Sequence, residues 1–276
     1  MDNISPKITD KLIELETWFD SRKGSIVAFS GGIDSTLVLF LARKFQGKDN
    51  VVGVISNSES LKNRDFQEAR TFCAKFDIHL EVIATKELED ERYNQNPINR
   101  CFFCKDHLFN DLSEISKKYP GFEVLSGTNI DDLGDYRPGI DAARKFEVKS
   151  PMVDCRITKD DIRLIAKYFK LPNWDKPASP CLSSRIPYNQ PVTLKKLKQI
   201  EAAEEILNSY GFADVRVRHY GTYGKIEVHR EELQKLSLIQ NEVVGKIIAL
   251  GFEHCEIDQE GLVSGKMNRV LTNLKD

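Results

Sequence analysis

With 276 residues and a hydrophobic content of 41%, the chain is long enough to bury a substantial core, in one large domain or in two unequal ones. A formal net charge of −2 excludes the basic excess on which binders of long nucleic acid depend, so small or compact substrates are favoured. The opening residues, Met1 to Pro6, lack a basic start, and no later stretch is apolar enough to span a bilayer; we therefore expect a cytoplasmic protein with no membrane partner.

The first part of the chain alternates between strand-like and helical segments. Four short apolar runs predict buried strands, at residues 25–29, 51–55, 79–83 and 122–125. Apolar residues at helical spacing predict helices at 7–22, 36–45 and 60–76. Strands that are apolar on both faces and alternate with helices predict an α/β fold, a doubly wound parallel sheet whose ligand crevice lies beyond the carboxyl ends of the strands.

The pattern changes from about Pro187 onward, which predicts a smaller α+β domain at 188–276 after a main domain at 1–187. A helix is expected at 194–209, and two strands at 214–219 and 225–229 flank a hairpin turn at 221–224. A second helix is expected at 231–250, followed by a short strand near Cys255.

A glycine-containing loop, Ser30-Gly31-Gly32-Ile33-Asp34-Ser35, stands between the first predicted strand and a predicted helix. Glycines there let backbone amides approach an anion, and the helix N-terminus adds favourable partial charge. No lysine follows the glycines and Asp34 occupies the loop instead, so transfer of a terminal phosphate is disfavoured. The alternative, a tight turn with no ligand, does not explain the strand and helix on either side.

This loop resembles the pyrophosphate loop of the ATP pyrophosphatase superfamily, which includes GMP synthetase, NAD synthetase and tRNA thiolases. The resemblance implies cleavage of ATP to AMP and pyrophosphate, with a substrate oxygen activated as its adenylate. It also implies that pyrophosphate and Mg²⁺ are held by Ser30, Gly31, Gly32, Asp34 and Ser35, with Asp34 and Ser35 in catalytic positions. Ser56 and Gly127, which end later strands, are expected near the adenosine.

Cys101 and Cys104 have the spacing that lets two thiolates converge on one metal or cluster. Cys181 stands in a loop rich in hydroxyls, 178–185, that reads as an active-site loop. Three thiolates can hold a [4Fe-4S] cluster and leave one iron open for sulfide or substrate. The alternatives are a zinc site with His107 as the fourth ligand, a redox pair of cysteines, and a chance pair without a function. The other cysteines are expected to be small buried hydrophobes: Cys73, Cys155 and Cys255.

Charged residues also follow a pattern in the second domain. Arg216 and Arg218 alternate with valines, so both project from one face of a strand, and Glu227 shares that face if the hairpin strands align. A solvated sheet face with weak ion pairs is the commoner explanation of such a stripe. Glu204, however, falls on the apolar side of the 194–209 helix and needs a cation or donor as its partner.

Five segments taken together resemble the LarE family, sulfur transferases that mature the nickel-pincer nucleotide of lactate racemase: 30–35, Asp135 to Gly139, 178–185, 216–218 and Ser264 to Met267. The resemblance implies that ATP adenylates a carboxylate of a pyridinium biscarboxylic acid mononucleotide and that sulfur then replaces the activated oxygen. It implies substrate binding by Arg185, Arg216, Arg218 and Lys266, and metal binding by Glu204 and Glu227. The implied partners are the mononucleotide, a sulfide donor, a nickel-insertion protein and further copies of the chain.

In the single-cysteine branch of that family, the loop cysteine gives up its own sulfur. This chain adds Cys101 and Cys104 to Cys181 and resembles the three-cysteine branch, in which a [4Fe-4S] cluster can be reloaded with sulfide. A tRNA thiolase shares the loop and the cysteines, whereas an amide-forming synthetase shares the adenylation but has no use for the thiols. A zinc-stabilised nucleotide-binding module is the non-enzymatic alternative.

Overall fold

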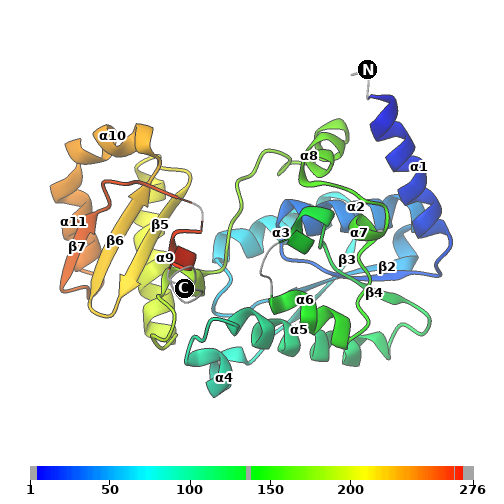
Figure 1. Cartoon of the computed structure of the whole chain (residues 1–276), viewed down its shortest axis with the longest axis horizontal. Helices are drawn as coiled ribbons and strands as arrows, with labels where there is room; N and C mark the ends of the chain where they lie inside the picture. The colour runs from blue at the N-terminus through cyan, green and yellow to red at the C-terminus, as the bar shows by residue number, and fades with distance from the viewer. Residues whose placement is uncertain (1–4, 135–137, 264, 270–276) are drawn as a thin grey trace. The chain divides into compact units, whose positions relative to one another are not determined.

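The computed structural model describes residues 5–134, 138–263 and 265–269 (Figure 1). Parts of two segments that resemble the LarE family lie outside the described residues, namely Asp135 to Arg137 and Ser264. The opening residues 1–4 lie outside them as well. The chain forms two compact units, Met1–Glu87 with Asn99–Ser179, and Leu88–Ile98 with Pro180–Asp276.

The second unit begins ahead of residue 187 and takes in a segment from the first half of the chain. Within it, the backbone N–H of Asn189 donates to Asn96 and that of Val192 donates to Asn94. Asn96 also donates from its side chain to the carbonyls of Ile186 and Pro187. These contacts are non-local, so a change in sequence pattern near Pro187 could not reveal them.

The first unit is built on the predicted parallel sheet. Its strands are β1 (Ser25–Ala28), β2 (Val51–Ser56), β3 (His79–Ile83) and β4 (Glu123–Leu125), in the order β3-β2-β1-β4. Because β1 lies between β2 and β4, the loop after β1 stands at the point where the strand order reverses, which is where open α/β sheets bind ligands. The doubly wound α/β prediction is confirmed.

Side chains of β1 alternate between two cores. Val27 packs with apolar residues of α1 (Pro6–Asp20), α2 (Ile33–Gln46), α3 (Asn63–Lys75), α7 (Pro151–Asp154) and α8 (Lys159–Tyr168). Ile26 and Ala28 pack with residues of α5 (Arg100–Ser116) and α6 (Pro138–Lys145). Helices therefore cover both faces of the sheet, and short 3₁₀ turns complete this unit: η1 (Lys48–Asn50), η2 (Glu87–Glu89) and η3 (Ile130–Gly134).

The second unit is a small α+β fold with its own core. Its sheet has the order β5-β6-β7, in which β5 (Val215–Tyr220) pairs antiparallel with β6 (Tyr223–Val228), and β6 pairs parallel with β7 (His254–Ile257). The remaining elements are α4 (Glu91–Asn94), α9 (Leu194–Ser209), α10 (Leu233–Leu238), α11 (Gln240–Ile248), η4 (Leu182–Arg185), η5 (Arg230–Glu232) and η6 (Lys266–Asn268).

Two local predictions for this unit need correction. The hairpin turn is shorter than expected, because Tyr220 pairs with Tyr223 and leaves only Gly221 and Thr222 between the strands. Gly221 has φ of 80°, a conformation that glycine adopts without steric cost. The helix expected at 231–250 is two helices, because Ile239 leaves helical geometry at φ of −117° while packing against the core. No helix within the described ranges has the length and apolar character needed to cross a membrane.

Candidate functional site

The phosphate-binding loop lies at the carboxyl end of β1. Helix α2 begins at Ile33, earlier than the sequence pattern suggested, so Asp34 and Ser35 belong to its first turn. Gly32 is the residue before the helix and has no side chain to cap it. The amides of this turn can therefore serve an anion, as the sequence predicts.

Ser35 holds the loop together from within. Its hydroxyl oxygen accepts from the backbone N–H of Ser30 at 3.2 Å and donates to the carbonyl of Gly32 at 3.1 Å. The hydroxyl of Ser30 lies 3.1 Å from the same oxygen. Ser35 is 4% exposed, which is consistent with a residue that shapes the loop.

Gly127 brings the segment after β4 against the start of α2. A Cβ atom at this position would lie 2.6 Å from the backbone N of Ser35 and 2.9 Å from the carbonyl carbon of Asp34. Only glycine fits so close to another backbone. The close approach gives Gly127 a packing role beside the loop, while the expected contact with adenosine stays a prediction.

Asn129 is a neighbour of Asp34 that sequence reasoning missed. Its side-chain nitrogen lies 3.5 Å from Oδ1 of Asp34, and its backbone N–H donates to the buried carboxylate of Asp132. Mg²⁺ prefers oxygen ligands, and the side-chain oxygen of Asn129 already accepts from the backbone N–H of Asp131, so of these two side chains only the carboxylate of Asp34 could bind the expected ion. The signal available in the sequence was the group of polar residues, Ser126, Thr128 and Asn129, that follows the predicted strand at 122–125.

Ser56 marks the end of β2, where its hydroxyl lies 2.6 Å from that of Thr85. Beyond it, the buried carboxylate of Glu87 is 3.4 Å from the hydroxyl of Ser60. The sheet order places the loop after β1 between the ends of β2 and β4. The structure thus brings the phosphate loop, Ser56 and Gly127 to one edge of the sheet.

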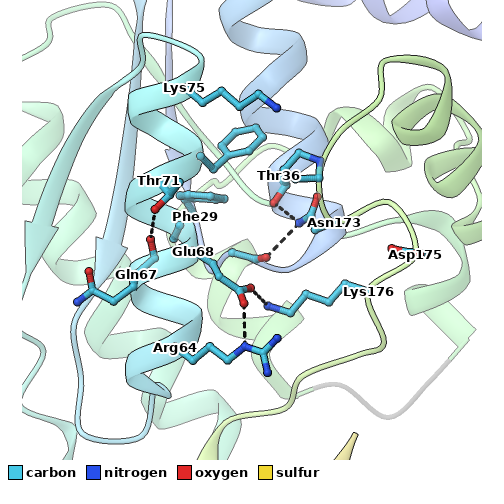
Figure 2. Close-up of a pocket in the computed structure, with 14 residues that line it drawn as sticks. Phe29, Thr36, Arg64, Gln67, Glu68, Thr71, Lys75, Asn173, Asp175 and Lys176 are labelled. Atoms are coloured by element: carbon cyan, nitrogen blue, oxygen red, sulfur yellow. Dashed lines mark hydrogen bonds and ion pairs between the residues drawn. The ribbon is translucent and has the colours of Figure 1, made fainter. Parts of the chain in front are cut away.

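A pocket of about 690 Å³ lies beside the phosphate loop (Figure 2). Gly31 and Thr36 line it together with α3 and the segment 172–176. Phe29 and Phe72 add aromatic rings to its lining.

Cys101 and Cys104 lie near the start of α5, three residues apart and therefore on the same side of the helix. Cys101 is exposed, and Cys104 and Cys181 are partly exposed. Cys181 is the residue before η4 and belongs to the second unit. Accessible thiols one helical turn apart fit a pair of metal or cluster ligands.

The other three cysteines are buried, as predicted. Burial raises the pKa of each of these thiols to about 12: Cys73, Cys155 and Cys255. They are therefore protonated at neutral pH and unsuited to metal binding. Across the part of the chain that the structure describes, no three or more histidine, cysteine, aspartate or glutamate side chains form a group that could hold a metal ion.

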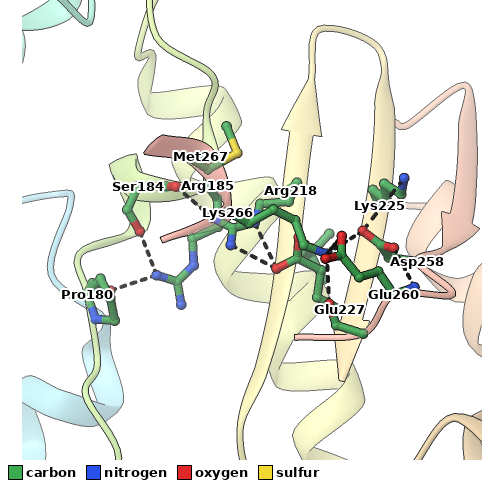
Figure 3. A network of polar contacts seen from close by, with 12 residues as sticks. Pro180, Ser184, Arg185, Arg218, Lys225, Glu227, Asp258, Glu260, Lys266 and Met267 are labelled. Atoms are coloured by element: carbon green, nitrogen blue, oxygen red, sulfur yellow. Dashed lines mark hydrogen bonds and ion pairs between the residues drawn. The ribbon is translucent and has the colours of Figure 1, made fainter. Parts of the chain in front are cut away.

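The loop after Cys181 is held by Arg185, which is 1% exposed (Figure 3). Its guanidinium donates to the carbonyl of Pro180 at 2.8 Å, to that of Cys181 at 3.3 Å and to the hydroxyl of Ser184 at 2.9 Å. Glu204 balances its charge through contacts of 2.8 and 3.1 Å. The expectation that Glu204 needs a cationic partner is confirmed.

Arg218 supports the same loop. It donates to the carbonyl of Ser184 at 2.9 Å and to Oε2 of Glu227 at 2.8 and 3.0 Å. Lys266 approaches Oε1 of Glu227 at 3.4 Å and donates to Asp258 at 2.7 Å. Glu204 and Glu227 each face a guanidinium, and their expected metal binding stays a prediction.

Arg216 differs from the other arginines. It stands directly opposite Glu227 in the β5–β6 pairing and is only 8% exposed. Its guanidinium has no hydrogen bond or ion pair with any residue that the structure describes. Burial, with Arg185 and Arg218 nearby, lowers the pKa of Arg216. The alternative that the charged side chains of β5 and β6 form a solvated sheet face is wrong, because Arg218 is 3% exposed and Glu227 is fully buried.

The chain is similar to known proteins over part or nearly all of its length. The NAD synthase family matches residues 9–99, which include the phosphate loop. A protein of Synechocystis sp. described as uncharacterized is 38% identical, with 96% of this chain and 99% of that protein aligned. The pyridinium-3,5-bisthiocarboxylic acid mononucleotide synthase of Lactiplantibacillus plantarum is 34% identical, with 89% of each chain aligned.

This alignment covers both the unit that carries the phosphate loop and the unit that carries the buried arginines. The chain therefore belongs to the LarE family of ATP pyrophosphatase-type sulfur transferases, the family of the L. plantarum synthase.

Proposed function

We propose that the enzyme adenylates a carboxylate of a pyridinium biscarboxylic acid mononucleotide with ATP and then replaces the activated oxygen with sulfur. In the first step a carboxylate oxygen attacks the α-phosphorus of ATP, and pyrophosphate leaves. In the second step sulfide attacks the acyl carbon and AMP leaves, so that a thiocarboxylate remains. The relative from L. plantarum, named as a synthase of the bisthiocarboxylic acid mononucleotide, supports this proposal.

The phosphate loop serves the first step. The uncapped first turn of α2 and the peptide after Gly31 would hold the pyrophosphate group, and Asp34 would act through Mg²⁺. The carboxylate of Asp34 would repel a phosphate group directly, because both are negatively charged. A cation between the carboxylate and the phosphate would let Asp34 help to bind the nucleotide. Ser35 would keep the loop in shape through its bonds to Ser30 and Gly32.

The observation that carries the substrate assignment is the buried guanidinium of Arg216. Burying a charge costs several kcal/mol unless a counter-charge compensates for it. Arg185 and Arg218 have such partners in Glu204 and Glu227, whereas Arg216 has no bonded partner among the described residues. An anionic substrate group, phosphate or carboxylate, would supply the missing charge through a two-point contact.

For the sulfur step we propose that Cys101, Cys104 and Cys181 hold a [4Fe-4S] cluster. Three thiolates are enough for such a cluster, which when bound would supply an iron that no protein residue occupies. Among the described residues the three thiols do not form a metal-binding group, so the proposal rests on their number and type. The chain's own contribution is to keep Cys181 in place, because Arg185 binds the carbonyls of Pro180 and Cys181. Arg185, Arg218 and Lys266 are proposed as further parts of the substrate site, in which their charges are already paired with carboxylates.

The test is a reaction under anaerobic conditions with ATP, Mg²⁺, the mononucleotide and sulfide, in which products are identified by mass spectrometry. We expect AMP, pyrophosphate and a thiocarboxylate, with more product than enzyme and with Cys181 unchanged in mass. Asp34→Ala should abolish pyrophosphate release without unfolding the protein, whereas alanine at any of the three cysteines should abolish sulfur transfer and spare pyrophosphate release. ADP and phosphate as the nucleotide products would refute the adenylation.

A different result would refute only the cluster. If product stops at one sulfur per chain, with dehydroalanine at position 181 and activity surviving loss of Cys101 and Cys104, the cysteine itself is the sulfur source.

A further inference from the structure

Asn173 connects the segment after α8 to the phosphate loop. Its side-chain nitrogen donates to the carbonyl of Gly31 at 3.2 Å and to the hydroxyl of Thr36 at 2.9 Å (Figure 2). A carbonyl only accepts, so the nitrogen of the amide, and not its oxygen, must face Gly31. The contact therefore fixes the orientation of both groups.

This contact determines where the next amide points. The carbonyl of Gly31 and the N–H of Gly32 belong to one peptide, and in a trans peptide the two groups point in opposite directions. Because the carbonyl faces Asn173, the N–H of Gly32 faces the other way, toward the hydroxyl of Ser30 at 3.5 Å. That distance makes a weak hydrogen bond, so the amide keeps capacity for a stronger acceptor.

A peptide between two glycines does not hold this orientation by itself. Gly31 has φ of 74°, and glycine moves between positive and negative φ at little cost. Rotation of this peptide would exchange the N–H for a carbonyl oxygen, which repels phosphate. An external donor to the Gly31 carbonyl favours the orientation that suits an anion.

Asn173 is in turn held by its own segment. Lys176 contacts Asp65 at 2.8 Å and Glu68 at 2.6 Å, and Ser179 donates to Asp65 at 2.8 Å. Burial opposes ionisation of Asp65, but the hydrogen bonds from Lys176 and Ser179 outweigh it and lower the pKa of that carboxyl. The segment is thus fastened to α3 on one side and to the phosphate loop on the other.

We propose that Asn173 is a positioning residue that holds the Gly31–Gly32 peptide with its N–H directed at the pyrophosphate group. The inference rests on the ATP-cleaving half of the proposed function and is independent of the sulfur step. It assigns a task in nucleotide binding to a segment that lies far from the loop in sequence.

The test measures binding of inorganic pyrophosphate with Mg²⁺ by calorimetry, using the full chain. Asn173→Leu removes the donor at similar volume, and Asn173→Asp keeps the shape but replaces the donor with an acceptor. Both should weaken pyrophosphate binding at least about tenfold and raise the KM for ATP, while the melting temperature stays close to that of the parent. Tyr168→Phe, an uncharged change at an exposed position of α8 outside the pocket, should bind as the parent does.

Two results would overturn the proposal: parental affinity in both variants, or weaker binding in Asn173→Asp alone, which repulsion by the new charge explains. Asn173→Ala replaces the leucine variant if that variant does not fold. This test does not depend on the sulfur-transfer assay of the proposed function. Even if the parent protein transfers no sulfur, its affinity for pyrophosphate can be compared with that of the Asn173 variants.

Discussion

Arg185 and Glu204 form a two-bond ion pair inside the second unit, with Nε to Oε1 at 2.8 Å and Nη2 to Oε2 at 3.1 Å. Both side chains are at least 97% buried. The carboxylate also accepts from the backbone N–H of Val217 at 3.1 Å. One carboxylate on α9 therefore ties together the Cys181 loop and strand β5.

Removing that carboxylate should destabilise the protein strongly. Glu204→Ala leaves the buried charge of Arg185 uncompensated, and we expect the free energy of unfolding to fall by about 3–5 kcal/mol. Urea denaturation measures the change. Glu242→Ala, which breaks an exposed pair with Lys246, is the matched control and should have little effect. Equal effects in the two variants would show that the Arg185–Glu204 pair is not buried in solution.

Arg216 and Arg218 project from the same face of β5 but should respond differently to substitution. Arg218→Leu removes the guanidinium partner of Glu227 and leaves Lys266 at 3.4 Å, so we expect a loss of at most about 3–5 kcal/mol in the free energy of unfolding. Arg216→Leu removes a buried charge that has no bonded partner among the described residues, so stability should be unchanged or higher.

Replacing Arg216 should weaken substrate binding even though it does not lower stability. Arg216→Leu should weaken binding of the anionic mononucleotide by about 2–5 kcal/mol and leave ATP binding unchanged. Calorimetric titration of each ligand measures the difference. Parental affinity for the mononucleotide, together with a lower melting temperature, would mean that Arg216 has only a structural role.

The six cysteines should separate into two groups when the cluster-free protein is alkylated at pH 8. Iodoacetamide reacts with the thiolate, and a pKa of about 12 leaves almost no thiolate at Cys73, Cys155 and Cys255. We expect modification of Cys101, Cys104 and Cys181 alone, followed by peptide mass spectrometry. Unfolding in urea should expose all six thiols, and rapid reaction of a buried thiol in the native state would contradict the assignment.

His219 should make stability depend on pH in the acidic range. Burial lowers the pKa of His219 to about 4, and the positive charge of Lys196 adds to the effect. Its other neighbours are the Oε1 atom of Gln199 at 3.2 Å and the ring of Phe252. Because the unfolded chain takes up this proton more readily, stabilisation is complete above about pH 6.5 and is lost as the pH falls toward 4.

From the shift in the pKa of His219, the free energy of unfolding should fall by roughly 3 kcal/mol between pH 6.5 and 4. Chemical denaturation across this range should show the loss in the parent protein. His219→Gln keeps a nitrogen in a similar position but does not titrate, so its stability should fall less. Identical pH profiles for the two proteins would show that His219 is not the titrating group.

Much of the fold could be predicted because its signals are local. The strand at 25–29 and the helix after it are continuous apolar segments, and the intervening glycines indicate an anion site without knowledge of distant residues. The break at Ile239 and the short turn at Gly221 were missed because tertiary packing and strand register, not propensity, set those boundaries. Asn173 was missed for a related reason, since its partners Gly31 and Thr36 are distant in sequence.

The amino-acid sequence by itself determined the parallel α/β sheet, the place of the phosphate loop and the separation of three accessible thiols from three buried ones. Those features depend on periodicity, residue type and short spacing, which are properties of neighbouring residues. Only the tertiary structure decided which arginine on β5 lacks a bonded partner, because Glu204 and Glu227 reach Arg185 and Arg218 from other elements of the fold. Charge compensation in a protein interior is set by such non-local contacts, so the surplus charge of Arg216 becomes visible only once the chain is folded.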